Sequence, residues 1–113
     1  MRQPKWNQYE VALLIETYAM IDNKIITKKQ AVSELSQLFR NYAIAHGNSI
    51  DKIYRNINGI SMRLEELRYL FTNGKSGLKN TSYLFRDMVV MYQTNQKEFQ
   101  RVLKVAERIY QEK

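Results

Sequence analysis

Apolar residues recur at helical spacing between positions 51 and 71. They are separated by steps of four, three, four, three and four, a register that keeps one face of a 3.6-residue helix apolar. Basic and amide side chains fill most of the remaining positions. The pattern predicts a helix with one buried face, around which we expect the chain to be organised. Its apolar positions are Ile53, Ile57, Ile60, Leu64, Leu67 and Phe71.

The dipeptide Asn58-Gly59 places a turn signal inside this pattern. Two arrangements fit it: one continuous helix, or a short turn of helix over Asp51–Arg55 that bends into a main helix over Ile57–Phe71. We favour the bend, with Asn56 as N-cap. Glycine costs about 1 kcal/mol in a helix interior but little in the first turn.

Four further helices are predicted, over about 8–21, 28–45, 82–93 and 95–110. Asn7, Thr27 and Asn95 are each followed three residues later by Glu or Gln, which is the spacing of a capping box. Gly47 is placed to end the second helix as a left-handed cap. The stretch 72–81 is rich in Asn, Gly, Ser and Lys, and we expect a loop there with Leu78 as its single apolar anchor.

No segment alternates with period two, so the fold class predicted is all-α: a compact bundle of about five helices in a single domain, residues 1–113. The first three helices are expected to form a helix-turn-helix-like core that the last two brace. In the first helix, Leu13 and Met20 widen the apolar stripe. We therefore expect that helix to lie between two neighbours.

The net charge of +7 is concentrated in the middle of the chain, where residues 40 to 86 hold eight basic and three acidic groups. A basic surplus favours an anionic partner, nucleic acid first and an acidic protein or membrane surface second, although it also serves solubility alone. There is no cysteine, no signal-peptide core at the amino terminus and no apolar run of membrane-spanning length. These features favour a cytoplasmic protein that does not enter the membrane.

Catalytic patterns are weak. Gly74-Lys75-Ser76 lacks the earlier glycine and the preceding strand of a phosphate-binding loop. His46, the only histidine, stands where it can cap terminal carbonyls, and Glu65-Glu66 point about 100° apart on a helix. There is no metal-ligand cluster. We expect a non-enzyme without a cofactor.

Two groups of residues are candidates for DNA contact. Arg and Asn are the side chains that read guanine and adenine edges, and a row of cations opposite an apolar helix face can follow phosphates. For each group the alternative is a structural role or a solvated face. Glu65 and Glu66 would repel phosphate, and Met62 and Tyr69 suggest that the central helix is covered on both sides. The candidates are Lys52, Arg55, Asn56, Asn58 and Arg63 in the centre, Lys75 and Lys79 in the following loop, and Lys97, Arg101, Lys104 and Arg108 on the last helix.

Several of these residues together resemble the amino-terminal helical domain of bacterial HNH-type restriction endonucleases and related DNA-targeting defence enzymes. The most specific part is the pattern RNxNGIxMRL, which runs from Arg55 to Leu64. The other matching positions are Trp6-Asn7, Glu10, Tyr18, Leu35, Leu38-Phe39-Arg40 and Gly77-Leu78.

The resemblance implies an accessory domain that helps bring a nuclease or helicase to DNA. Arg55, Asn56, Asn58 and Arg63 lie on the matching segment, where Arg55 and Asn56 either touch DNA or hold the bend between helices. Trp6 and the Arg-to-Leu helix are also similar to Myb-like three-helix modules. The chain has no HNH motif, so it is either a domain excised from a larger enzyme or a standalone relative whose partner supplies the activity.

Two rival hypotheses remain. The first is a helical adaptor that binds a protein partner, or dimerises, through surplus apolar surface at Leu13, Met20, Met62 and Tyr69. The second is a small phage-type inhibitor of a nucleic-acid enzyme, which fits the size of the chain.

Overall fold

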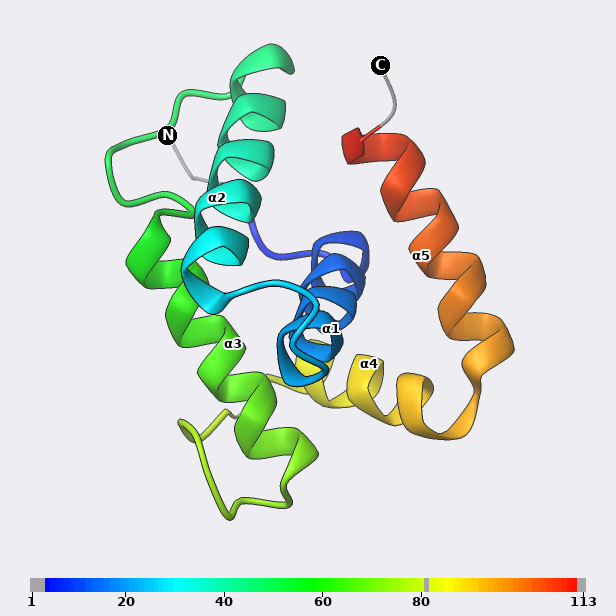
Figure 1. Ribbon diagram of the computed structural model, residues 1–113. Helices are drawn as coiled ribbons and strands as arrows, with labels where there is room; N and C mark the ends of the chain where they lie inside the picture. Colours follow the sequence, from blue (N-terminus) through cyan, green and yellow to red (C-terminus); the bar gives the residue numbers. More distant parts are fainter. Residues whose placement is uncertain (1–3, 81, 112–113) are drawn as a thin grey trace.

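Five helices account for most of the computed structural model, which describes residues 4–80 and 82–111 (Figure 1). No strand occurs in these residues, so the predicted all-α fold class is confirmed. The helix-turn-helix-like arrangement of the first three helices stays a prediction. The helices are α1 (Gln8–Asp22), α2 (Lys28–Ala45), α3 (Ile57–Phe71), α4 (Tyr83–Thr94) and α5 (Gln96–Gln111).

The helix starts follow the predicted capping residues. Asn7 and Glu10 form a complete capping box on α1, and Thr27 accepts a hydrogen bond from the Gln30 amide at the start of α2. Asn95 Oδ1 accepts from the Glu98 amide at the start of α5. Gly47, with φ of 79°, follows the last residues of α2 in the left-handed conformation. These local signals therefore set the helix bounds.

Helix α1 is the centre of the bundle and contacts each of the other four helices. Six consecutive residues, Glu10–Ile15, are buried, so α1 is enclosed on every side rather than along one stripe. The expectation that residues 51–71 organise the fold is wrong for this reason. Leu13 also belongs to the core and does not supply surplus surface. One connected core joins residues of all five helices.

The segment before α3 is a turn and not the short helix expected for Asp51–Arg55. Asp51 Oδ1 accepts from the amides of Ile53 and Tyr54, and Arg55 has a φ of 46°. The turn takes Ile53 out of the helical register, and this residue is 73% exposed. Ile57, the first residue of α3, is exposed as well. The buried stripe of α3 begins at Ile60.

The loop after α3 folds back along that helix. The Leu78 amide donates to the Glu65 carbonyl at 3.0 Å, and Gly77 (φ of 89°) lies directly against the α3 backbone. Leu78 itself is exposed, so the expected apolar anchor is wrong. The polar side chain of Asn80 is buried instead and donates to Glu66 Oε1 at 2.8 Å. Among the described residues, no helix has the length and apolarity to cross a membrane.

Candidate nucleic-acid interface

Arg55 forms a buried ion pair with Glu10 of α1. Its Nε donates to Glu10 Oε2 at 3.0 Å, and its Nη2 donates to Glu10 Oε1 at 3.1 Å and to the Pro4 carbonyl at 3.2 Å. The two side chains are only 7% and 4% exposed. The guanidinium is therefore occupied inside the protein and does not face solvent.

The local backbone explains why Arg55 turns inward. Its left-handed conformation reverses the chain just before the N-cap of α3, and Ser36 Oγ donates to its carbonyl at 2.7 Å. Arg40 Nη1 donates to the carbonyls of Asp51 and Tyr54 at 3.0 and 2.5 Å. Helix α2 thus holds the turn from one side while Glu10 holds it from the other.

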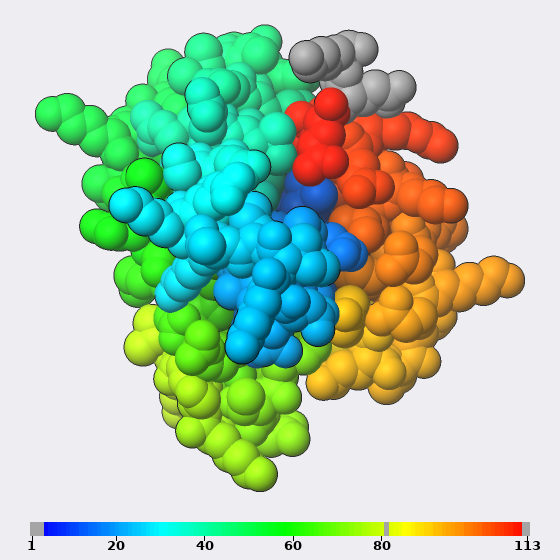
Figure 2. Space-filling model, viewed as in Figure 1, coloured from blue at the N-terminus to red at the C-terminus, as the bar shows by residue number. Residues whose placement is uncertain are grey.

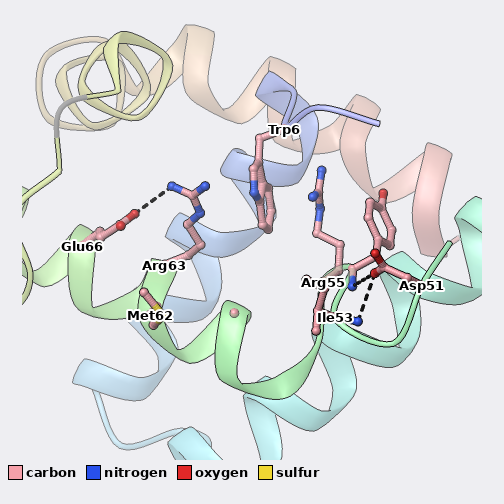
Figure 3. Close-up of a pocket in the computed structure, with 9 residues that line it drawn as sticks. Trp6, Asp51, Ile53, Arg55, Met62, Arg63 and Glu66 are labelled. Carbon is pink, nitrogen blue, oxygen red and sulfur yellow. Dashed lines mark hydrogen bonds and ion pairs between the residues drawn. The ribbon is translucent and has the colours of Figure 1, made fainter. Parts of the chain in front are cut away.

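The Trp6 ring lies between the side chains of Arg55 and Arg63 (Figure 3). The distances from its centroid to the two Cζ atoms are 3.8 and 5.4 Å. Arg63 also donates to Glu66 Oε1 at 2.9 Å and lies 5.1 Å from the Phe85 ring. Both arginines of the RNxNGIxMRL pattern are therefore engaged internally, Arg55 fully and Arg63 in part.

The neighbouring polar residues are in part engaged within the protein and in part exposed. Asn56 is the N-cap of α3, and its side chain accepts from the Gly59 amide at 2.7 Å. Lys52 and Asn58 are exposed on the turn and on the first turn of α3. Of the two roles left open for Arg55 and Asn56, these contacts favour holding the bend. Lys52 and Asn58 stay candidates for contact with a ligand.

A groove of about 370 Å³ opens beside these residues. Exposed Ile53 and Met62 are part of its lining, together with Trp6 and Gly59. The arginines that reach it are each paired with a carboxylate, and Asp51 also lines it, so the groove offers no surplus positive charge for a phosphate. Its apolar lining fits an uncharged side chain better.

The acidic residues expected to repel phosphate on α3 are also paired. Lys28 Nζ donates to Glu65 Oε2 at 2.7 Å, and Arg68 Nη2 lies 3.8 Å from the same oxygen. The Lys28 hydrogen bond holds the pKa of Glu65 below its ordinary value. The C-terminal half of α3 is covered outside by the loop: a Cβ at Gly77 would lie 2.7 Å from the Tyr69 nitrogen. Met62 lies beyond this cover and is exposed.

The loop lysines do not gather with Lys52. Lys75 and Lys79 are exposed, on a loop that folds back along α3 through the Leu78 hydrogen bond. Lys52, however, precedes the start of α3, and the loop follows its end. The 15 residues of α3 span about 22 Å. The central candidates are therefore spread along the helix.

The outer face of α5 carries the most regular row of cations. Lys97, Arg101, Lys104 and Arg108 are all exposed, opposite a face that buries Phe99, Val102, Leu103 and Ala106. Arg101 forms an ion pair with Glu98, and its hydrogen bonds lower the pKa of that carboxyl. Long side chains project from the orange and red segments at the edge of the molecule (Figure 2).

The α5 row and the central segment lie on different sides of the molecule. Within the described residues α5 contacts α1, α2 and α4 but not α3. Helices α3 and α5 flank α1 on opposite sides (Figure 1). The eleven candidate DNA-contact residues therefore do not form one surface.

Sequence reasoning missed the roles of Trp6 and Glu10 at this site. Glu10 was visible as a capping residue and as a matching position of the resemblance, and its pairing with Arg55 across 45 positions has no local signal. His46 Nδ1 lies 2.9 Å from the Tyr42 carbonyl at the end of α2, and in the tautomer that carries a proton on Nδ1 it donates to this oxygen. Across residues 4–80 and 82–111, no group of three His, Asp or Glu side chains is arranged to hold a metal ion.

A comparison of the chain with protein-family models finds no match, and comparisons with curated proteins and with solved structures find none either. Function is therefore argued from the residues and their geometry.

Proposed function

We propose that this chain is a non-catalytic DNA-binding module whose main phosphate contacts lie on the outer face of α5. The observation that carries the proposal is the exposed row of Lys97, Arg101, Lys104 and Arg108 opposite the buried face of the helix. Its cations are three or four residues apart, which places them about 5 to 6 Å from one another along the axis. Such a row suits the regular phosphates of one strand.

The distribution of ion pairs supports α5, rather than the central segment before and in α3, as the site of DNA contact. In the described part of the chain, Lys97, Lys104 and Arg108 form no ion pair with a carboxylate, whereas Arg55, Arg63 and Arg68 are all paired. A Lys or Arg side chain releases condensed counterions from DNA when it neutralises a phosphate, and only a side chain without a carboxylate partner does so fully. Lys52 and Asn58, on the far side of α1, would add contacts only if DNA bends or a second molecule binds there.

The biological setting we propose follows from the resemblance noted in the sequence. The module would act in the cytoplasm of a bacterium and bring a nuclease or helicase to DNA in restriction or defence. The buried Arg55–Glu10 pair gives the first arginine of the RNxNGIxMRL pattern a structural role.

A salt titration of binding to a short DNA duplex tests the proposal. Two to four phosphate contacts predict that log K falls with log salt with a slope of about −2 to −4, from roughly 0.9 per neutralised phosphate. Fluorescence anisotropy of a labelled duplex measures it. A flat salt dependence, or no binding at low salt, would rule out the module as a DNA binder.

A second candidate is a protein-binding adaptor, and the groove favours it. Exposed Ile53 and Met62 on a groove with balanced charge fit an apolar side chain of a partner. If the chain does not bind DNA, Met62→Glu tests the adaptor hypothesis, because it should abolish co-purification with a co-encoded nuclease. Ile25→Glu, at an exposed position elsewhere, should leave this complex intact.

A further inference from the structure

Helix α4 presents a face that neither the core nor the proposed DNA contact uses. Tyr83 is 77% exposed and Val90 is 54% exposed, and Arg86 and Asp87 are exposed between them. At about 100° per residue these four positions fall within one arc of roughly 100° on the helix. The opposite face buries Phe85, Met88 and Val89.

The order of residues on this face is self-complementary. In an antiparallel pair with a two-fold axis between Arg86 and Asp87, Tyr83 lies opposite Val90 of the second copy. Arg86 then lies opposite Asp87 of the second copy, and the same two contacts recur on the other side of the axis. Each apolar residue meets an apolar residue, and each charge meets its opposite.

The side chains already share this face in the monomer. The Arg86 Cζ atom lies 5.9 Å from the Tyr83 ring centroid, so the guanidinium lies over the ring on the exposed side of α4. Arg86 and Asp87 form no ion pair in the described residues, which leaves both charges available to a second copy.

We propose that α4 mediates an antiparallel, two-fold symmetric association between two copies of this chain. Helix α4 has 12 residues and is about 18 Å long, so the contact falls below the roughly 1,200 Å² of a standard stable interface. The dimer is therefore weak and reversible. This association is independent of DNA binding and is tested without DNA.

Sedimentation equilibrium from micromolar to millimolar protein measures it. We expect the weight-average mass to rise from 13.5 kDa toward twice that value. Arg86→Glu and Asp87→Lys each put like charges opposite one another and should lower the association constant by about tenfold or more. The double variant Arg86→Glu with Asp87→Lys exchanges the two charges and should restore association.

This set of variants separates pairing from net charge. The single variants change the net charge in opposite directions, and the double variant leaves it unchanged. Lys29→Glu, at an exposed position on α2, changes the net charge as Arg86→Glu does; it is the control and should associate like the wild type. Should a charge variant unfold by circular dichroism, Val90→Asn replaces it; this variant sets a polar amide opposite Tyr83 without a change of net charge and should weaken association. A monomeric wild type, unaffected single variants or a double variant that stays monomeric would each overturn the proposal.

Discussion

At the scale of single residues, Arg55 carries the largest energetic consequence. Its guanidinium is almost fully buried, and its charge is balanced by Glu10. Removal of one partner of such a pair leaves the other charge buried and uncompensated. We expect Arg55→Ala to lower the free energy of unfolding by about 3–5 kcal/mol. Urea denaturation followed by circular dichroism measures this loss.

Two companion variants sharpen that prediction. Arg55→Gly removes the same ion pair but relieves the left-handed backbone, so it should be about 1 kcal/mol more stable than Arg55→Ala. Arg101→Ala breaks an ion pair at the surface and should leave the urea midpoint close to that of the wild type. A loss for Arg55→Ala as small as that for Arg101→Ala would show that the buried pair is not needed for folding.

Glu65 predicts a pH effect at the same scale. Its pKa in the folded protein lies below the unfolded value of about 4.3, because Lys28 bonds the ionised form. The resulting stabilisation is present above that unfolded pKa and is lost as the pH falls through the folded pKa. At neutral pH, Glu65→Gln should lose up to about 1 kcal/mol relative to wild type, since the pair is partly exposed.

Urea midpoints from pH 7 down to pH 2 test this pH effect. The difference between wild type and Glu65→Gln should shrink to zero at the acid end. A difference that stays constant over the whole range would mean that the Lys28 contact does not stabilise the folded state.

At the scale of elements, Gly77 ties the loop to α3. A side chain there would overlap the Glu65 carbonyl and the Tyr69 nitrogen, and the φ of 89° disfavours any residue with a Cβ. We expect Gly77→Ala to cost about 2–4 kcal/mol, from backbone strain plus overpacking. Thermal and urea unfolding of the variant measure it.

Gly47 is the matched control for that substitution. It has a similar φ of 79°, but a Cβ there meets no atom within 4 Å. Gly47→Ala should therefore cost only about 1 kcal/mol, the strain contribution alone. Equal losses for the two variants would show that the loop does not pack on α3 as closely as described.

The helices themselves were predictable because their signals are local. Asn7, Thr27 and Asn56 start helices through hydrogen bonds to amides two or three residues away, and such spacings can be read in the sequence. Ile53 shows the limit of periodicity. It matches the apolar spacing of α3, yet it precedes the N-cap and lies on a turn, so it is exposed.

At the scale of the whole molecule, the placement of the helices was not predictable. The sequence suggested residues 51–71 as the centre, but α1 is enclosed by the other four helices. The candidate site was predicted only in part for the same reason. Glu10 and Trp6 lie beside Arg55, and Trp6 also lies beside Arg63; these partners are distant in sequence and have no local signature. Only the pairing of Arg63 with Glu66, three residues later on the same helix, follows a spacing that the sequence shows.

The cations on α5, in contrast, could be predicted as exposed, because their exposure depends on the apolar face of one helix alone. Lys97 and Lys104 lie opposite a strongly apolar face, so any packing that buries that face exposes both cations. We propose that this row, rather than the net charge of +7 as a whole, binds DNA.

The most direct measurement compares the salt slopes of two variants that each remove two positive charges. Lys97→Gln with Lys104→Gln alters the α5 row, and Lys24→Gln with Lys29→Gln alters exposed lysines at the connection between α1 and α2. For binding to the same duplex, we predict that the α5 variant lowers the magnitude of the slope by about 2, at roughly 0.9 per phosphate, and that the control keeps the wild-type slope. Equal slopes for the two variants would contradict the account.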